Sequence, residues 1–144
     1  MNAFWWALLA AGIWGVTSFI EKYALFKIEP IPSLFYRCAG VLLGLFVLFA
    51  FMLKPSQIKA VDLRSASLLF IAGFLGSFVA FIAFYKALKI GEMSMVVPVS
   101  ASFFLISFLL GIFVLGETLT WMKGIGVLLI SIGVWMLGAG TWVR

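Results

Sequence analysis

FFLISFLLGIFVLGETLTWMKGIGVLLISIGVWML, residues 103–137, is the stretch that decides the fold of this chain. Residues 93–116 carry no charge, and neither do residues 124–143. The charged residues between these two segments are Glu117 and Lys123. Roughly 20 apolar residues, each rising 1.5 Å along an α-helix, cross a hydrocarbon core about 30 Å thick. The stretch therefore predicts two membrane-spanning helices joined by a short polar turn.

The rest of the chain repeats this alternation of long apolar segments and short polar connections. Of the 144 residues, 65% are hydrophobic and 10% are charged, whereas soluble domains carry roughly 25% charged residues. Five apolar segments predict helices at about 3–22, 33–53, 65–88, 94–115 and 119–142. None alternates polar and apolar residues as a barrel strand does. We expect an all-α polytopic membrane protein, with residues 1–144 forming a single domain of five transmembrane helices in one compact bundle and the two termini on opposite sides.

The residue types argue against several classes of function. The single cysteine, Cys38, cannot form an internal disulfide, and the lack of histidine removes the usual metal clusters, so neither a metal nor a cofactor is expected. The ten Lys and Arg residues are scattered singly between apolar segments, which favours lipid headgroups over nucleic acid as their partner. No His-rich, Ser-x-Lys or paired mid-membrane Asp arrangement supports an enzyme.

The basic residues give almost no signal for orientation in the membrane. With five spans, four basic residues fall on the side of the N-terminus and five on the other side. The positive-inside rule orients a protein through an excess of Lys and Arg in short loops. Two interpretations stay open: a weak signal that a partner or the first helix overrides, or a dual topology in which copies insert both ways and pair as an antiparallel dimer.

Small residues are spaced for close packing between helices. Gly40 and Gly44 form a Gly-x-x-x-Gly motif in the second span, and Gly126 and Gly133 lie at heptad spacing in the fifth. Helices in lipid associate mainly where small residues let their backbones approach closely. We expect these glycines to form helix contacts within the chain or at the interface of a dimer.

The fourth span carries a proline together with several serines. Pro98 cannot donate a hydrogen bond to the carbonyl of Ser94, so this helix is expected to kink. Ser102 and the other serines of the span then have two interpretations. Their hydroxyls line a polar cavity, or they bond back to the carbonyls of their own helix.

Two charged residues have informative positions. Arg37 lies inside the second span, about four residues or roughly 6 Å from its end. It either snorkels to the interface or lies at the mouth of a cavity, paired with Glu21 or Glu92, where it meets an anionic group of a substrate. Glu117 is expected to act as a structural cap of the last helix or to pair with Lys123.

Several short motifs together resemble one known family. In chain order they are Trp14-Gly15, Arg37, Tyr85-Lys-Ala-Leu88, Val97-Pro98, Leu115-Gly-Glu-Thr-Leu119, Gly124, Leu129-Ile130 and Gly133-Val134. Their order and spacing resemble an EamA-type domain of the drug/metabolite transporter superfamily over the whole chain. Many relatives carry two such units in tandem. The resemblance therefore implies that this single unit works as a homodimer or as a heterodimer with a similar small membrane protein.

Residues 126–134 also resemble the dimerising last helix of the small multidrug-resistance proteins, which belong to the same superfamily. Those proteins carry an acidic residue in their first helix. Ala11 or Gly12 stands at that place here, which argues against proton-coupled drug export by a homodimer.

The resemblance implies a half-size transporter of small metabolites in a bacterial or archaeal cell membrane. Together with depth in the membrane, it places Trp14, Thr17, Pro98 and Ser102 in the wall of a substrate cavity and Arg37 near its mouth. Two alternatives stay open. One is an accessory or heteromeric subunit of a larger membrane transporter, without transport of its own, and the other is an efflux protein like the small multidrug-resistance proteins.

Overall fold

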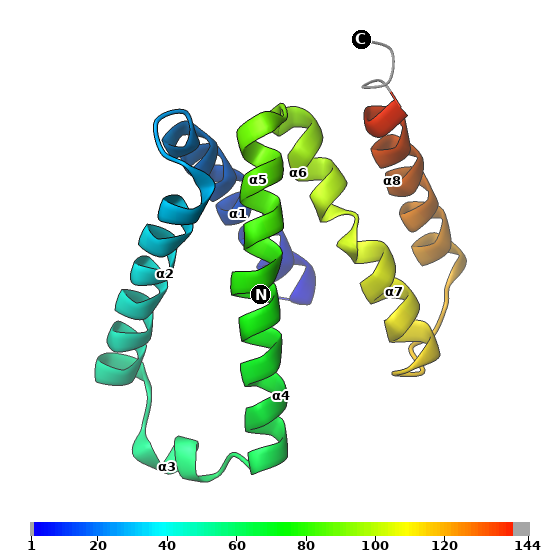
Figure 1. The fold of residues 1–144 in the computed structure, drawn as a ribbon. Coiled ribbons are helices and arrows are strands. Elements are labelled where there is room, and N and C mark those ends of the chain that lie inside the picture. The colour runs from blue at the N-terminus through cyan, green and yellow to red at the C-terminus, as the bar shows by residue number, and fades with distance from the viewer. Residues whose placement is uncertain (1, 140–144) are drawn as a thin grey trace. The chain divides into compact units, whose positions relative to one another are not determined.

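The computed structural model describes residues 2–139, and every regular element in that range is a helix (Figure 1). In chain order the elements are α1 (Ala3–Leu25), α2 (Pro30–Val47), the π-helix η1 (Leu48–Met52), α3 (Pro55–Lys59), α4 (Leu63–Phe74), the π-helix η2 (Leu75–Val79), α5 (Ala80–Ile90), α6 (Met93–Ala101), α7 (Phe103–Phe113) and α8 (Trp121–Ala139).

Adjoining elements together give five helical segments that are long and apolar enough to cross a membrane: Ala3–Leu25, Pro30–Met52, Leu63–Ile90, Met93–Phe113 and Trp121–Ala139. The predicted all-α fold with five transmembrane helices is confirmed. The observed ends lie within one helical turn of the predicted ones, except that the predicted end at residue 142 lies outside the described residues.

The packing divides the chain into unit 1, Met1–Ile90, and unit 2, Gly91–Arg144. In unit 1, α5 packs against both α1 and α2. In unit 2, α6 packs against α8. That residues 1–144 form one bundle stays a prediction.

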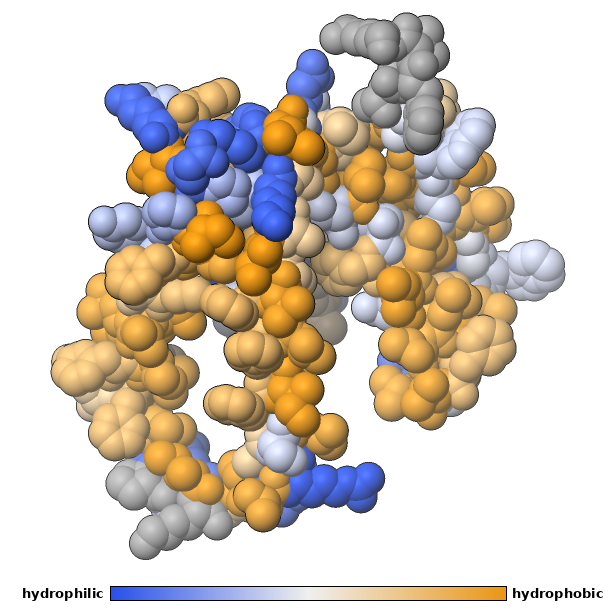
Figure 2. Space-filling view, in the orientation of Figure 1, coloured by the Kyte–Doolittle hydropathy of each residue, from blue (hydrophilic) through white to orange (hydrophobic). Residues whose placement is uncertain are grey.

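The core of unit 1 is small and lies where the ends of α1, α2 and α5 meet. Its buried apolar side chains are Leu25, Leu34, Tyr85 and Leu88. Most other apolar side chains of the unit face outward, as expected for helices whose solvent is lipid. On the face shown in Figure 2, hydrophilic residues gather at the ends of the unit 1 spans and hydrophobic ones cover the length between them.

Two lysines tie the ends of α1 and α5 to each other. Lys22 on α1 donates from Nζ to the carbonyl of Leu88 at 2.6 Å. In the opposite direction, Lys89 on α5 donates to the carbonyls of Leu25 at 2.8 Å and Ile28 at 3.2 Å. The last carbonyls of a helix have no partner within it, and lysines near a C-terminus satisfy them. Each span therefore caps the end of the other.

The start of α4 is held by Asp62. Its Oδ2 accepts a hydrogen bond from the backbone N–H of Ser65 at 2.9 Å, the usual N-cap arrangement. This bond favours the ionised carboxylate, so the pKa of Asp62 lies below its ordinary value. The cap marks the point where the chain enters its third span.

The turn between α7 and α8 reverses at Gly116, which has φ +69°. This left-handed conformation brings the N–H of Glu117 back to the carbonyl of Gly111 at 3.0 Å. The cap of α8 is provided instead by Thr120, whose Oγ1 accepts from the N–H of Lys123 at 3.3 Å. The Glu117 carboxylate lies against Gly111, where an added Cβ would be 3.3 Å from Oε2.

The surroundings of Glu117 show which helix end it contacts. The sequence suggested that its carboxylate reaches forward to the start of α8. The positive φ at Gly116 instead turns Glu117 back onto the end of α7. Lys123 likewise bonds through Nζ to the carbonyl of Thr118, at 3.0 Å.

Replacing Gly116 with alanine should destabilise the protein, because a left-handed conformation costs a residue with a Cβ about 1–2 kcal/mol. The midpoint of thermal unfolding of the purified protein should fall by roughly 3–6 °C. Gly124→Ala is the matched control: it lies inside α8, no described atom lies within 4 Å of its added Cβ, and alanine favours helix. An equal loss in both variants would contradict a special role of Gly116.

Candidate functional site

A polar cluster centred on Arg37 lies within the spans of unit 1. The Nε of Arg37 on α2 lies 3.3 Å from Oε1 of Glu21 on α1. Its Nη1 donates to the backbone carbonyl of Ser77, in η2, at 3.2 Å. The side chains of Arg37 and Glu21 are only 23% and 17% exposed. Glu21, one of the two partners that the sequence suggested for Arg37, lies beside it.

The cluster reaches toward the middle of the membrane. Ser77 lies midway along the span Leu63–Ile90, about 20 Å from either end at the helical rise of 1.5 Å per residue. A snorkelling arginine would direct its guanidinium to the nearer interface. Because Arg37 bonds instead to a carbonyl at mid-span, the structure disfavours the snorkelling interpretation.

The carbonyl that Arg37 contacts lies in a π-helix. At the end of η2, the N–H of Ala80 donates to the carbonyl of Leu75, five residues earlier, rather than four as in an α-helix. Such a widened turn shifts the hydrogen-bond ladder and disturbs the pairing of nearby carbonyls. The carbonyl of Ser77 falls in this turn and accepts from Arg37. This contact could not be predicted from the sequence, where the adjacent Gly76 and Ser77 are the only local signal.

Aromatic rings complete the cluster. The Arg37 guanidinium carbon lies 3.5 Å from the centroid of the Phe81 ring, well within the range of a cation–π interaction. Tyr85, one turn further along α5, is 2% exposed and hydrogen-bonds to Glu21 through its side chain. The Phe81 and Tyr85 rings pack edge to face at 5.7 Å. Glu21, Arg37 and these two rings thus join α1, α2 and α5 in one network.

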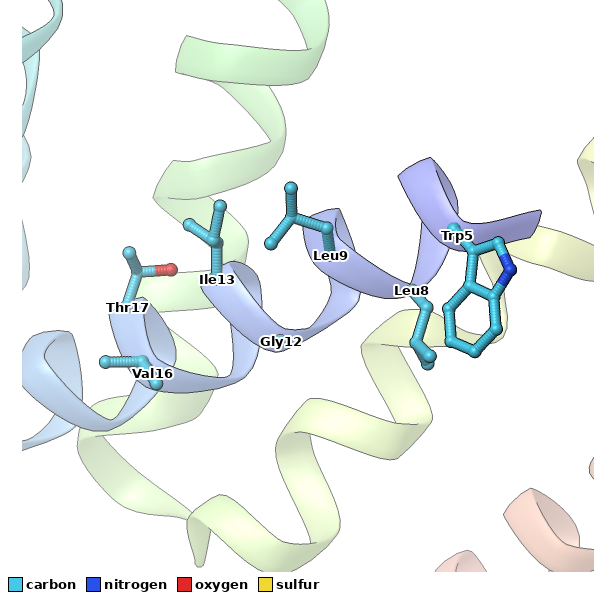
Figure 3. A pocket seen from close by; sticks show the side chains of 7 residues that line it. All are labelled: Trp5, Leu8, Leu9, Gly12, Ile13, Val16 and Thr17. Carbon is cyan, nitrogen blue, oxygen red and sulfur yellow. The ribbon is translucent and has the colours of Figure 1, made fainter. Parts of the chain in front are cut away.

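Trp14 and Thr17 lie on α1, outside this network. The Thr17 hydroxyl donates to the Trp14 carbonyl at 3.0 Å, so it bonds back to its own helix. An open groove of about 600 Å³ runs along seven residues of α1 between Trp5 and Thr17, and its lining is almost entirely apolar (Figure 3). Thr17 lines this groove and Trp14 does not. Their role in a substrate cavity stays a prediction.

In unit 2 the fourth span is interrupted at Ser102. Helix α6 contains Pro98 and ends at Ala101, and α7 starts at Phe103. The N–H of Ser102 donates to the carbonyl of Val99 at 3.1 Å, three residues earlier, instead of to Pro98. The predicted kink is present, and it takes the form of a break one turn after the proline. Pro98 therefore lies one turn before the break, and Ser102 lies at it.

The four glycines expected at helix contacts lie in α2 and α8. At each of Gly40, Gly44, Gly126 and Gly133, no described atom of the glycine's own unit lies within 4 Å of the position that a Cβ would take. Their backbones are therefore accessible within each unit. Contact through them with a second subunit stays a prediction.

These features define the class of the protein: a polytopic helical membrane protein with one discontinuous span and a charged pair placed within its spans. Comparison with known sequences narrows this class. The profile of the EamA-like transporter family matches residues 1–139. The chain therefore belongs to the EamA-like transporter family.

Two relatives are of similar size. An uncharacterized protein of Methanocaldococcus jannaschii is 32% identical over 133 residues, covering 90% of this chain and 91% of the relative. A Sinorhizobium protein described as an uncharacterized transporter in the cobO 3′ region is 28% identical over 135 residues, covering 92% of this chain and 93% of the relative. No solved structure shows significant similarity to the chain.

Proposed function

We propose that this protein is a half-size transporter that moves small metabolites across a bacterial or archaeal cell membrane, and that it acts as a dimer. The family supports membrane transport as the general function. The two relatives, one archaeal and one bacterial, support the choice of membrane. Transport, rather than catalysis, is the activity that the family favours.

The break in the fourth span is the observation that carries this proposal. Backbone that leaves the helical ladder inside a membrane is tolerated where it is buried in protein or lines a water-filled cavity. Discontinuous helices line the midplane sites of many secondary transporters, where their unpaired backbone groups contact the substrate. Pro98 and Ser102 flank such a discontinuity here. We assign the wall of the substrate path to this part of unit 2.

The dimer is proposed because the five spans correspond to one repeat of a two-repeat transporter. Alternating access generally uses two repeats that move against each other around a fixed site. This chain provides one set of five spans, and its two relatives match it over almost their whole length, so they are of the same size. A second copy, or a similar small protein, would provide the other repeat. Gly126 and Gly133 on α8 are the residues we place at the contact between subunits.

Reconstitution tests this function directly. The purified protein, with its oligomeric state measured, is placed in liposomes loaded with a panel of labelled amines, amino acids, organic acids and nucleosides. We expect at least one class to exchange across the membrane faster than in liposomes without protein, and the active species to be a dimer. An accessory subunit would move nothing alone, so a panel with no exchange above the control would contradict the proposal.

A further inference from the structure

The guanidinium of Arg37 fills a site that other parts of unit 1 build. Glu21 provides a carboxylate, Ser77 a backbone carbonyl and Phe81 an aromatic face, each in contact with a different part of the guanidinium. Carboxylates, carbonyls and aromatic faces are the groups with which proteins bind organic cations. We propose that these three groups form a cation-binding site for guanidinium and alkylammonium groups, which Arg37 occupies as a cation tethered to the chain.

The geometry matches the shape of a guanidinium. This group is planar, carries donors along its edges and stacks with its face on aromatic rings. In the structure, the edge nitrogens Nε and Nη1 bond to Glu21 at 3.3 Å and to Ser77 at 3.2 Å, while the central carbon lies 3.5 Å from the Phe81 centroid. Both edges and the face are used at once. A round ammonium group would not satisfy all three contacts equally well.

The charges favour a cation over an anion as the occupant of this site. Glu21 already neutralises Arg37, so the pair as a whole has little attraction for an anionic substrate. Without Arg37, by contrast, the site would expose a carboxylate and a carbonyl at low solvent access within a span. A carboxylate without a counter-charge in that position is costly and strongly attracts a counter-ion.

A consequence for transport rests on the proposed function. In cation-coupled transporters, an acid within the spans can bind the coupling proton or ion during the cycle. Arg37 supplies that charge permanently to Glu21. The protein is therefore expected to move its substrate without binding a coupling cation at Glu21.

Removing the tethered cation should create a site for a free one. In Arg37→Ala, guanidinium chloride at low millimolar concentration should bind between Glu21, Ser77 and Phe81. Ligand binding to the folded state raises thermal stability, so the unfolding midpoint of the variant should rise by about 3 °C or more relative to sodium chloride at equal concentration. The wild-type protein, with its site occupied, should show no such rise.

Two controls separate this site from general ion effects. The double variant Glu21→Gln with Arg37→Ala lacks the carboxylate and should not respond to guanidinium. Arg64→Ala, at the exposed start of α4, removes an arginine that has no part in the cluster and should also not respond. Methylammonium should stabilise Arg37→Ala less than guanidinium, because it lacks the planar face.

Three results would overturn the proposal: no response of Arg37→Ala to guanidinium, an equal response of the double variant, or an equal response of the wild type. If Arg37→Ala is not recovered in folded form, purification with guanidinium present should recover it or Arg37→Ser, and failure of both would count against a replaceable cation. The readout is unfolding of purified protein. It is therefore independent of transport, and a protein that moves no metabolite can still pass or fail this test.

Discussion

Arg37→Met is expected to lower the midpoint of thermal unfolding of the purified protein by roughly 5–10 °C, one of the largest effects of any single substitution in the chain. The variant leaves the Glu21 carboxylate and the Ser77 carbonyl without their partner at a site where both ionic side chains are less than a quarter exposed. Breaking a fully buried pair costs about 3–5 kcal/mol. Partial exposure reduces this, so we expect a cost of about 2–3 kcal/mol.

A double-mutant cycle isolates the contribution of the pair. Glu21→Gln alone leaves Arg37 without its counter-charge, whereas the double variant Glu21→Gln with Arg37→Met leaves no charge in the cluster. We expect the double variant to lose less stability than the sum of the two single variants, with a coupling of about 1–2 kcal/mol. Arg64→Met serves as the matched control and should change stability by no more than about 0.5 kcal/mol. A loss in Arg37→Met no greater than in this control would contradict the structural role of the cluster.

The spans and their number could be predicted because the bilayer leaves few solutions. Within a hydrocarbon core, a helix pairs its backbone groups internally. Each uncharged apolar segment of sufficient length therefore predicts one span. The same constraint predicted the kink in the fourth span. Pro98 has no backbone N–H to donate to the helix, and the bilayer core has no water to take its place.

Contacts that depend on the register of a helix could not be predicted. From the sequence, Arg37 had two candidate partners, Glu21 and Glu92, because both acids are expected at span ends on the same side of the membrane. The contact with Ser77 depends on the π-helix η2, which shifts every later residue around the helix axis. No pattern of apolar residues marks such an insertion.

The direction in which Glu117 turns also depends on a local feature. The sequence places Glu117 three residues before Thr120, and either side chain suits a cap of the following helix. The sign of φ at Gly116 decides between them, and here it directs Glu117 backward to Gly111. Recognising the glycine as a left-handed residue would have favoured Thr120.

Pro98→Ala should reduce transport by about tenfold or more while leaving membrane insertion intact, which corresponds to a loss of about 1.4 kcal/mol in the rate-limiting step. Alanine restores the N–H that donates to the carbonyl of Ser94 and favours a continuous helix through Ser102. If the discontinuity exposes backbone groups to the substrate, closing it removes those contacts. The measurement is the initial rate of exchange in liposomes for whichever metabolite class the wild type moves.

Ser102→Leu tests the same substrate path in a different way. It adds a larger side chain at the break, whereas Pro98→Ala favours a continuous helix. The larger apolar side chain at the break should change the relative rates for substrates of different size and polarity, with a smaller effect on overall stability than Arg37→Met. Ser107→Leu is the matched control, because this serine is exposed and lies on α7, clear of the break. If Ser102→Leu and Ser107→Leu leave the order of substrates equally unchanged, the break does not line the path. A continuous helix in Pro98→Ala with unchanged transport would lead to the same conclusion, because the rate would then be independent of the break at Ser102.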